Sequence, residues 1–305
     1  MTASRNQLPM TSHQPPATNN QQPAPSSRVT DHESRLNINT DLARLILVKF
    51  IREEVQRTGL SRAVVGVSGG IDSALSCLLA AEALGPQNVL AVRMPYKTSS
   101  ADSLAHAQLV IDKSGVQSET FEITNMVEPL LATIPPNNTK RRGNVMARAR
   151  MIVLYDRSGG QQALVIGTGN KTEIMLGYST LYGDSASALN PLGDLYKTQV
   201  RQLARTVGVP EPIIDKPPTA DLWQGQTDED ELGFTYERVD QLLYLLVDQR
   251  YRPEECVEAG FEKKFVEHVL NRVRQNQFKR MPPIIAKLSN RTVGYDFLYL
   301  RDWGT

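Results

Sequence analysis

The sequence contains few cysteines, few histidines, few aromatic residues and almost no net charge. Its two cysteines, Cys77 and Cys256, are too few for a disulfide scaffold or a four-thiolate zinc site. The 34 Lys and Arg nearly balance the 33 Asp and Glu, so a formal charge of +1 gives no general attraction to nucleic acid or to an anionic membrane. Two of the four histidines, His106 and His268, lie in helical patterns and the others lie near the N-terminus, which does not favour a Ser-His-Asp hydrolase.

Long hydrophobic runs are also missing. No apolar run approaches the ~18 residues that a membrane helix needs, and residues 1–10 lack the apolar stretch of a signal peptide. The hydrophobic content of 40% is nevertheless enough for a substantial core. We therefore expect a cytoplasmic globular protein that binds neither membrane nor nucleic acid.

The first 34 residues differ in composition from the rest of the chain. Five Pro, seven Asn or Gln and nine Ser or Thr together make up 21 of them. Such a segment cannot bury enough apolar surface to offset the entropy that it would lose on ordering. We expect residues 1–34 to be a disordered tail, inert rather than partner-binding, and residues 35–305 to form a single domain.

The rest of the chain alternates short buried strands with helices. Strands are expected at four segments: 63–67, 88–95, 119–124 and 163–167. Helices are expected at seven further segments: 40–59, 73–84, 101–113, 145–155, 196–206, 236–248 and 262–275. This alternation requires right-handed crossovers, and it predicts a doubly wound, Rossmann-like α/β fold whose parallel sheet has helices on both faces. Beyond Gly193 the chain is expected to be mostly helical.

The first of these helices has a clear start and an apolar pattern. Asn39 or Thr40 can cap its N-terminus. Four apolar residues recur at helical spacing: Leu42, Leu45, Ile46 and Phe50. Their spacing predicts that they form the face that packs on the core.

The strongest chemical signal is the segment Gly66-Val67-Ser68-Gly69-Gly70-Ile71-Asp72-Ser73, between a predicted strand and a predicted helix. Adjacent glycines allow positive φ and leave no Cβ to block an anion, and the helix start offers free N–H groups and a partial positive charge. Ser68 and Ser73 add hydroxyl donors, and Asp72 could hold a magnesium ion beside bound phosphates. The segment predicts a polyphosphate site. The alternative is a tight strand-to-helix turn in which Asp72 only complements the helix dipole.

The segment belongs to neither of two common nucleotide-binding patterns. It lacks the Gly-Lys-Ser/Thr ending of a Walker A loop and the glycine spacing of a dinucleotide fingerprint. Its Ser-Gly-Gly-x-Asp-Ser pattern resembles the pyrophosphate loop of the N-type ATP pyrophosphatases, which cleave ATP between the α and β phosphates and adenylate an acceptor. The members that thiolate tRNA generally need clustered cysteines, and glutamine-dependent members need a glutaminase domain for which this chain has no room.

Seven further motifs follow in a fixed order: Ala91–Tyr96, Gly143–Met151, Gly167–Glu173, Tyr182–Asp184, Asn190–Lys197, Lys216–Leu222 and Asp228–Gly233. With the phosphate loop they resemble the ammonia-dependent NAD+ synthetases over about residues 39–303. The resemblance implies an adenine nucleotide alpha hydrolase-like fold and a carbon–nitrogen ligase. In that reaction ATP adenylates the nicotinate carboxylate of deamido-NAD+ and releases pyrophosphate, and ammonia then displaces AMP to give NAD+. It also implies Mg2+ and a homodimer whose acceptor site lies at the subunit interface.

The resemblance also implies roles for single residues. Asp72 and Lys197 would be catalytic, and Asp72 and Glu173 would bind magnesium. ATP would contact the whole 66–73 loop and four further residues: Arg93, Thr168, Lys197 and Thr219. Deamido-NAD+ would contact Arg148 and Lys279.

Two of these residues have features of their own. Asn170-x-x-Glu173 also matches a capping box, so Glu173 could cap a helix instead of binding metal. A lysine at a helix start is unfavourable for the helix dipole, which suggests that Lys197 has an anionic partner. Arg150 lies about 200° round the helix from Arg148 and is expected to face solvent or a second subunit.

The acceptor half departs from the family pattern. Where many members have Lys, Asp and His, this chain has Leu181, Ala188 and Phe278. Phe278 could stack on a base or on nicotinate. Two alternatives therefore stay open: an ATP-dependent amide ligase that acts on another carboxylate, and a non-catalytic nucleotide-binding protein.

The segment 217–233 is polar and rich in turn residues. Alone, such a run is usually a solvated loop. By resemblance it is a mobile lid that orders over ATP and keeps water from the reactive anhydride.

Overall fold

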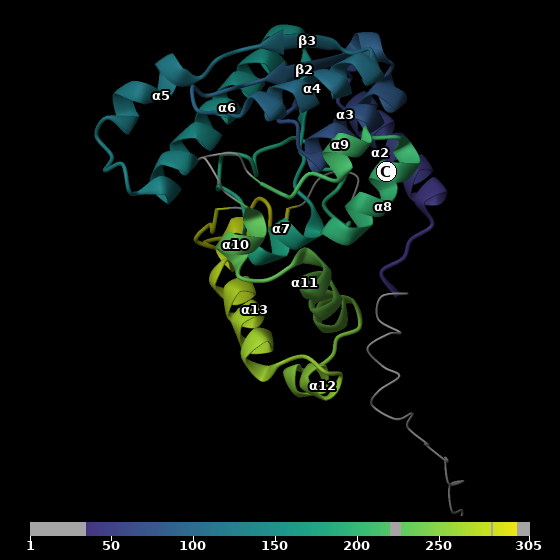
Figure 1. The fold of residues 1–305 in the computed structure, drawn as a ribbon, viewed down its shortest axis with the longest axis vertical. Coiled ribbons are helices and arrows are strands. Elements are labelled where there is room, and N and C mark those ends of the chain that lie inside the picture. Colours follow the sequence, from purple (N-terminus) through teal and green to yellow (C-terminus); the bar gives the residue numbers. More distant parts are fainter. Residues whose placement is uncertain (1–34, 220–226, 282, 298–305) are drawn as a thin grey trace, which may run out of the picture.

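The computed structural model describes residues 35–219, 227–281 and 283–297, and it consists of an α/β body with a smaller helical part on one side (Figure 1). The predicted tail, residues 1–34, lies outside the described residues, as do residues 220–226 of the predicted lid. In the described part, no helix has the length and apolarity that a membrane crossing would need.

The α/β body is built on one parallel sheet. Its strands are β1 (Arg62–Gly66), β2 (Val89–Arg93), β3 (Gln117–Thr120) and β4 (Ala163–Ile166), and they lie in the order β3-β2-β1-β4. The chain crosses from β1 to β2 and β3 in one direction and then returns to place β4 on the other side of β1. The loops that follow β1 and β4 therefore meet at a switch point, where open α/β sheets bind their ligands. The predicted doubly wound parallel sheet is confirmed.

Both faces of the sheet are covered, as alternating side chains in β1 require. Ala63 and Val65 contact the core under one set of helices, while Val64 between them contacts the core on the opposite face. The first face carries α2 (Thr40–Arg57), α3 (Ile71–Leu84), α4 (Ala101–Ser114), α8 (Lys197–Val207) and α9 (Glu211–Ile214). The opposite face carries α5 (Thr124–Leu131) and α6 (Thr139–Gln161).

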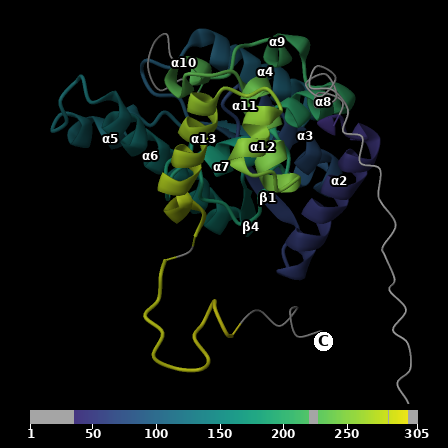
Figure 2. The same ribbon diagram turned by 90° about the horizontal axis from the view of Figure 1, so that it is seen from below.

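The helical part has its own apolar core. It contains α7 (Lys171–Leu176), α10 (Asp228–Leu232), α11 (Tyr236–Leu243), a π-helical turn (Tyr244–Asp248), α12 (Pro253–Glu258) and α13 (Lys263–Gln275). Side chains such as Leu176, Leu242 and Val269 are fully buried in this core. Tyr196, the residue before α8, also packs there, so α8 is shared by the two parts. Figure 2 shows α11, α12 and α13 together on one side of the body, and residues 283–297 extending away from α13.

Most predicted elements are present within a few residues of their expected bounds. Others differ more. The strand expected at 119–124 ends at Thr120, and four short helices were not expected: α5, α9, α10 and α12. Helix α6 begins at Thr139, inside the expected polar break. Asn138 caps α6 by accepting from the N–H of Arg141, and residues 139–141 of its first turn are exposed.

The face assigned to α2 was wrong. Leu42, Leu45 and Ile46 are 53%, 65% and 56% exposed, and Phe50 is only partly buried. The helix instead buries the opposite stripe against α3 and α8: Val48, Ile51 and Val55. Both stripes are apolar, so the spacing predicts a helix but does not say which face meets the core.

Truncating each of two isoleucines of α2 tests this assignment. Ile51→Ala should lower the free energy of unfolding by about 2–5 kcal/mol, because it leaves a cavity in the core. Ile46→Ala, one and a half turns earlier on the exposed face, should change it by no more than about 0.5 kcal/mol. Urea unfolding followed by circular dichroism measures both values. Equal losses would show that the two faces are buried alike.

Candidate active site

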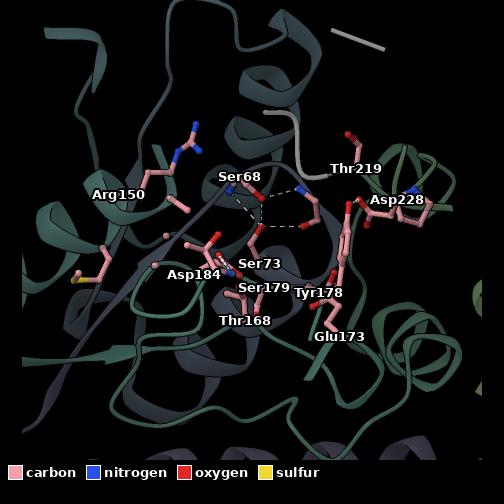
Figure 3. A pocket seen from close by; sticks show the side chains of 18 of the residues that line it. Ser68, Ser73, Arg150, Thr168, Glu173, Tyr178, Ser179, Asp184, Thr219 and Asp228 are labelled. Carbon is pink, nitrogen blue, oxygen red and sulfur yellow. Dashed lines mark hydrogen bonds between the residues drawn. The ribbon is translucent and has the colours of Figure 1, made fainter. Parts of the chain in front are cut away.

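A cleft of about 1170 Å³ lies at the carboxyl ends of β1, β2 and β4 and reaches across to the helical part (Figure 3). One wall comes from the loop after β1 and from Met94 and Thr168, which follow β2 and β4. The other wall includes Tyr178 and Asp228. The cleft therefore occupies the switch point of the sheet and is closed by residues that come much later in the chain.

The 66–73 loop joins β1 to α3 and is fixed by its two serines. The Ser73 hydroxyl donates to the Gly70 carbonyl (2.9 Å) and accepts from the Ser68 N–H (3.2 Å), and the two serine hydroxyls are 3.1 Å apart. Gly70, the N-cap of α3, has no side chain to cap the helix. The start of α3 faces the cleft through Ile71 and Asp72, so an anion could accept from its first N–H groups.

Gly69 is required by the close approach of this loop to α4. Its φ is +82°, and a Cβ at this position would lie 2.2 Å from the Ser103 carbonyl oxygen. An L side chain is disfavoured by both the backbone angle and the contact. Gly69 is the one residue of the loop that does not line the cleft.

The centre of the cleft holds a buried ion cluster. The Lys197 ammonium lies 2.5 Å from Asp72 Oδ2 and 3.3 Å from Glu173 Oε1, and only 3% of its side chain is exposed. Asn170 donates from Nδ2 to Asp72 Oδ1 (2.9 Å). The anionic partner expected for Lys197 is thus a pair of carboxylates of the protein itself.

Glu173 caps α7, as one of its two interpretations predicts, and it also faces the ion cluster. It forms a capping box with Asn170: Asn170 Oδ1 accepts from the Glu173 N–H (3.0 Å), and Glu173 Oε2 accepts from the Asn170 N–H (3.3 Å). Its other oxygen faces Lys197. Capping α7 and facing the cluster are therefore compatible, because the two carboxylate oxygens point to different partners.

The cluster has more negative than positive groups. Burial raises the pKa of Glu173 to about 8 although Lys197 acts against this, and burial also raises the pKa of Asp228. Burial opposes the charge of Lys197, but Asp72 and Glu173 outweigh it and raise the pKa of the ammonium. One ammonium does not fully compensate the surrounding carboxyl groups, so the cluster favours a further cation.

The donor set fits magnesium only in part. Two carboxylates, Asp72 and Glu173, meet at one ammonium, but no group of three or more His, Cys, Asp or Glu in the described ranges could hold a metal by itself. Mg2+ is commonly held by one or two carboxylates together with phosphate oxygens and water. The residues therefore fit a magnesium ion that arrives with a nucleotide, and do not fit a resident all-protein site.

A second group of contacts was not predicted from the sequence. Asp228 is 4% exposed and accepts from the hydroxyls of Tyr178 (3.1 Å) and Tyr236 (3.2 Å). Its N–H donates to the Pro218 carbonyl (3.0 Å). The alternative of a solvated acidic run therefore does not apply to Asp228. Its carboxylate contacts one tyrosine 50 residues away and one eight residues away, and no local pattern indicates either contact.

The other predicted site residues line the same cleft, with one correction. Fourteen of the fifteen candidates do so, all except Gly69: Gly66, Val67, Ser68, Gly70, Ile71, Asp72, Ser73, Arg93, Arg148, Thr168, Glu173, Lys197, Thr219 and Lys279. Arg150 was expected to face solvent or a second subunit, and this was wrong. It also lines the cleft (Figure 3), and its Nε donates to the Met94 carbonyl (3.0 Å), because an arginine side chain is long enough to reach from α6 to the end of β2.

The predicted acceptor half is less charged than the centre. Lys279 donates to the carbonyls of Gly177 and Ser179, both at 2.6 Å, so its ammonium is already used to hold the loop after α7. Leu181 and Phe278 line the cleft, and Phe278 is 58% exposed. Ala188 is not among the lining residues.

Two arginines at the edge of the cleft are tied to the protein. Arg148 donates from Nε and Nη2 to the Leu181 carbonyl, at 3.2 Å each. Arg93 donates from Nη1 to Gln108 Oε1 (2.5 Å), and its buried Nε has no hydrogen-bond partner among the residues that the structure describes.

Comparisons with known proteins agree with the geometry. The family model described as NAD synthase matches residues 45–283. The NH(3)-dependent NAD(+) synthetase of Trichlorobacter lovleyi is 59% identical over 271 residues, which cover 89% of this chain and 99% of that protein. Among solved structures, the NH3-dependent NAD synthetase of Campylobacter jejuni has a TM-score of 0.70 at 31% identity, covering 82% of this chain and all of that one. The NMN synthetase of Francisella tularensis has a TM-score of 0.74 at 30% identity, covering 83% and 100%.

Glu173→Gln should change the pH dependence of stability. The pKa of Glu173 is raised on folding from 4.5 to about 8, so the folded chain binds the extra proton, and the stability that this proton gives is lost as pH rises through that range. Gln cannot ionise. The unfolding free energy of the variant relative to wild type should therefore rise with pH, by at most roughly 1.4 kcal/mol per pH unit.

Urea unfolding of both proteins at several pH values between about 5 and 9, without magnesium, measures this difference. Lys49→Met, on the exposed side of α2, serves as a charge-changing control with a flat difference. Parallel curves for wild type and Glu173→Gln would contradict the raised pKa.

Gly69→Ala and Gly70→Ala should have different effects. Alanine at position 69 would have to adopt φ near +82° and clash with the Ser103 carbonyl, and we expect a loss of about 2 kcal/mol or more. Gly70 has φ −93°, and a Cβ there would lie 3.5 Å from Ser68 Oγ, an ordinary contact. Gly70→Ala should fold normally but weaken phosphate binding. Thermal unfolding of both variants tests this difference in stability. Equal unfolding temperatures would contradict the claim that position 69, unlike position 70, requires glycine.

Proposed function

The chain belongs to the NAD synthase family, and on this premise we propose that it is an ammonia-dependent ligase that uses ATP to convert deamido-NAD+ to NAD+. AMP and pyrophosphate are the other products. The observation that carries the proposal is the junction of the 66–73 loop with Lys197 and its two carboxylates in one cleft. In this junction a loop that can bind phosphates lies next to a cluster of charged side chains.

ATP is proposed to lie along the start of α3. The N–H groups there, together with the hydroxyls of Ser68 and Ser73, can hold the phosphate oxygens without any net charge. Thr168 and Thr219 lie on the facing walls and add hydroxyl donors, and Arg93 lies where the adenosine half would extend. These contacts fix the α-phosphate, so that the carboxylate of the acceptor can approach it in line with the departing pyrophosphate.

Lys197 is proposed to act on the first step. The nicotinate carboxylate and the α-phosphate are both anions, and their approach is opposed by repulsion. A buried ammonium beside them offsets that repulsion far more than it would in water. Because its burial is nearly complete, Lys197 needs no reorganisation of solvent when charge moves to the leaving pyrophosphate.

Asp72 and Glu173 would hold a magnesium ion together with the phosphates. When bound, the ion supplies positive charge to the phosphate oxygens. Asp72 also orients Lys197 through its 2.5 Å contact, and Asn170 orients Asp72 in turn. The protein thus fixes the positions of the Lys197 ammonium and of the two carboxylates relative to the phosphates.

In the second step ammonia attacks the adenylated carboxylate directly. A covalent intermediate on a cysteine does not fit the chain: burial raises the pKa of Cys77 to about 12 and that of Cys256 to about 11, so both thiols stay protonated near neutral pH. AMP is a good leaving group, and the small amine needs only access and orientation. Exclusion of water from the cleft would protect the anhydride from hydrolysis.

The acceptor is proposed to occupy the half of the cleft between α6 and α13. Arg148 lies there, and Phe278 and Leu181 offer flat and apolar surface to the nicotinate ring. In this arrangement Lys279 acts mainly through the loop that it holds, at Gly177 and Ser179. We also propose that the chain acts as a homodimer in the cytoplasm, which rests on the resemblance and on composition.

A second candidate is favoured by the likeness to an NMN synthetase and by the apolar residues Leu181 and Phe278. In this case the acceptor is a mononucleotide with the same nicotinate carboxylate. The chemistry at Lys197 would be unchanged, and only the acceptor half would differ. The two candidates are separated by the acceptor that supports turnover.

Purified protein with ATP, magnesium and ammonium should form NAD+ and AMP from deamido-NAD+. Lys197→Met should lower kcat by about 100-fold or more, because it removes the buried charge, while Lys49→Met on the exposed face of α2 should not change it. Chromatography of the nucleotides measures both. Formation of ADP, or an active Lys197→Met variant, would contradict the mechanism. Turnover with nicotinate mononucleotide alone would select the second candidate.

A further inference from the structure

Asp240 is a buried carboxylate outside the cleft that the mechanism above does not use. It lies on α11 in the helical part and has no exposed surface. Its Oδ1 accepts from the Thr172 hydroxyl (2.5 Å), and its Oδ2 accepts from the Thr198 N–H (2.8 Å). One carboxylate therefore joins α11 to both α7 and α8.

These bonds complete the N-terminus of α8. The first N–H groups of a helix have no partner within it. At α8, the Lys197 N–H donates to Thr172 Oγ1 (3.0 Å) and the Thr198 N–H donates to Asp240. The cap that a helix usually receives from its own N-cap residue is here supplied by two other helices, and a negative charge near this end is favourable for the dipole.

The residues bound by Asp240 are the direct neighbours of the cluster. Thr172 precedes Glu173, and Thr198 follows Lys197. The Lys197–Glu173 contact of 3.3 Å joins the same two helices that Asp240 holds from behind. Asp72 reaches the cluster independently, from α3. Asp240 thus adds bonds from a third helix to the direct contact between α7 and α8, beside the point where these charges meet.

A purely structural role would not require a carboxylate here. Burial raises the pKa of Asp240 to about 6, which means that its charge is costly. Buried ionised groups can often be replaced by apolar ones without loss of stability. A carboxylate, however, is the side chain whose two oxygens both accept, and this site has two donors on two different helices.

We propose that Asp240 is a positioning residue that sets Lys197 and Glu173 at the distance needed to bind and activate ATP. It does not touch the substrates. The inference rests on the proposed function for its kinetic consequence, but its effect on ATP binding can be measured without turnover.

Asp240→Asn tests the requirement for two acceptors. Asn keeps the shape but has one acceptor oxygen. If that oxygen accepts from the Thr198 N–H, the NH2 group faces the Thr172 hydroxyl, which must then accept a second bond beside that of the Lys197 N–H and loses the acceptor for its own proton. We expect kcat to fall about tenfold or more and the Kd of ATP, measured by calorimetry with magnesium, to rise at least about fivefold. The KM for deamido-NAD+ should change little, since the acceptor half is not attached to Asp240.

A second pair of variants covers the case in which Asp240→Asn does not fold. Thr172→Val removes the hydroxyl and should reproduce the losses, while Thr172→Ser keeps it and should retain most of the activity and ATP affinity. Thr172→Val also removes the acceptor of the Lys197 N–H, so its loss can exceed that of Asp240→Asn. The double variant should lose less than the sum of the two single losses, because Thr172 and Asp240 bond to each other.

Val239→Ala is the matched control for simple destabilisation. Val239 is the neighbour of Asp240 on α11 and is equally buried, but it has no bond to α7 or α8. At temperatures below its unfolding midpoint, Val239→Ala should keep the kcat and the ATP affinity of wild type. The proposal is overturned if Asp240→Asn keeps them too, if Thr172→Val equals Thr172→Ser, or if Val239→Ala loses as much.

A failure of the proposed function can be distinguished from a failure of the positioning role of Asp240. If the wild type binds ATP but forms no NAD+, the function is wrong, and the ATP affinities of the five variants still decide the role of Asp240. If the wild type does not bind ATP, the positioning role is overturned as well.

Discussion

A single buried ammonium is the constraint on which the rest of this structure depends. Lys197 can be charged inside the protein only because Asp72 and Glu173 lie against it, and these carboxylates come from two other helices. The fold must therefore bring α3, α7 and α8 to one point and hold them there. The switch point of the sheet supplies α3 and its phosphate loop, and the capping contacts at Thr172, Thr198 and Asp240 supply the register of the other two. Folding and the proposed catalysis both require these residues to lie at the same positions.

The phosphate loop and the sheet could be predicted from the sequence because their signals are local. Contiguous residues encode the turn between β1 and α3, and alternation of strands and helices encodes the parallel order. The ion cluster was predicted in a different way. No local pattern marks Glu173 or Lys197 as site residues, and their roles were inferred from the resemblance over the whole chain. The structure shows that Glu173 and Asp72 both contact the Lys197 ammonium, while their roles in catalysis remain proposals.

What could not be predicted depends on partners distant in sequence. Asp228 looks like part of an exposed acidic run, and only Tyr178 and Tyr236 make it a buried residue. No sequence pattern around Asp240 indicates that it accepts hydrogen bonds from two other helices. On α2 the exposed and the buried stripes are both apolar, so hydrophobicity could not choose between them. The predicted direction of Arg150 was wrong for a simpler reason, because the end of a long side chain need not follow the direction of its Cα–Cβ bond.

The separate hydrophobic core of the helical part has a consequence for how the protein would lose activity. Asp72 is anchored in the sheet-bearing body, whereas Glu173 lies on a helix whose Leu176 belongs to the core of the helical part. A partial opening of that core would pull the charges apart while the sheet stayed intact. Heat could then inactivate the protein before most of its secondary structure is lost, so residual circular dichroism would be a poor guide to how much working enzyme a stored sample contains.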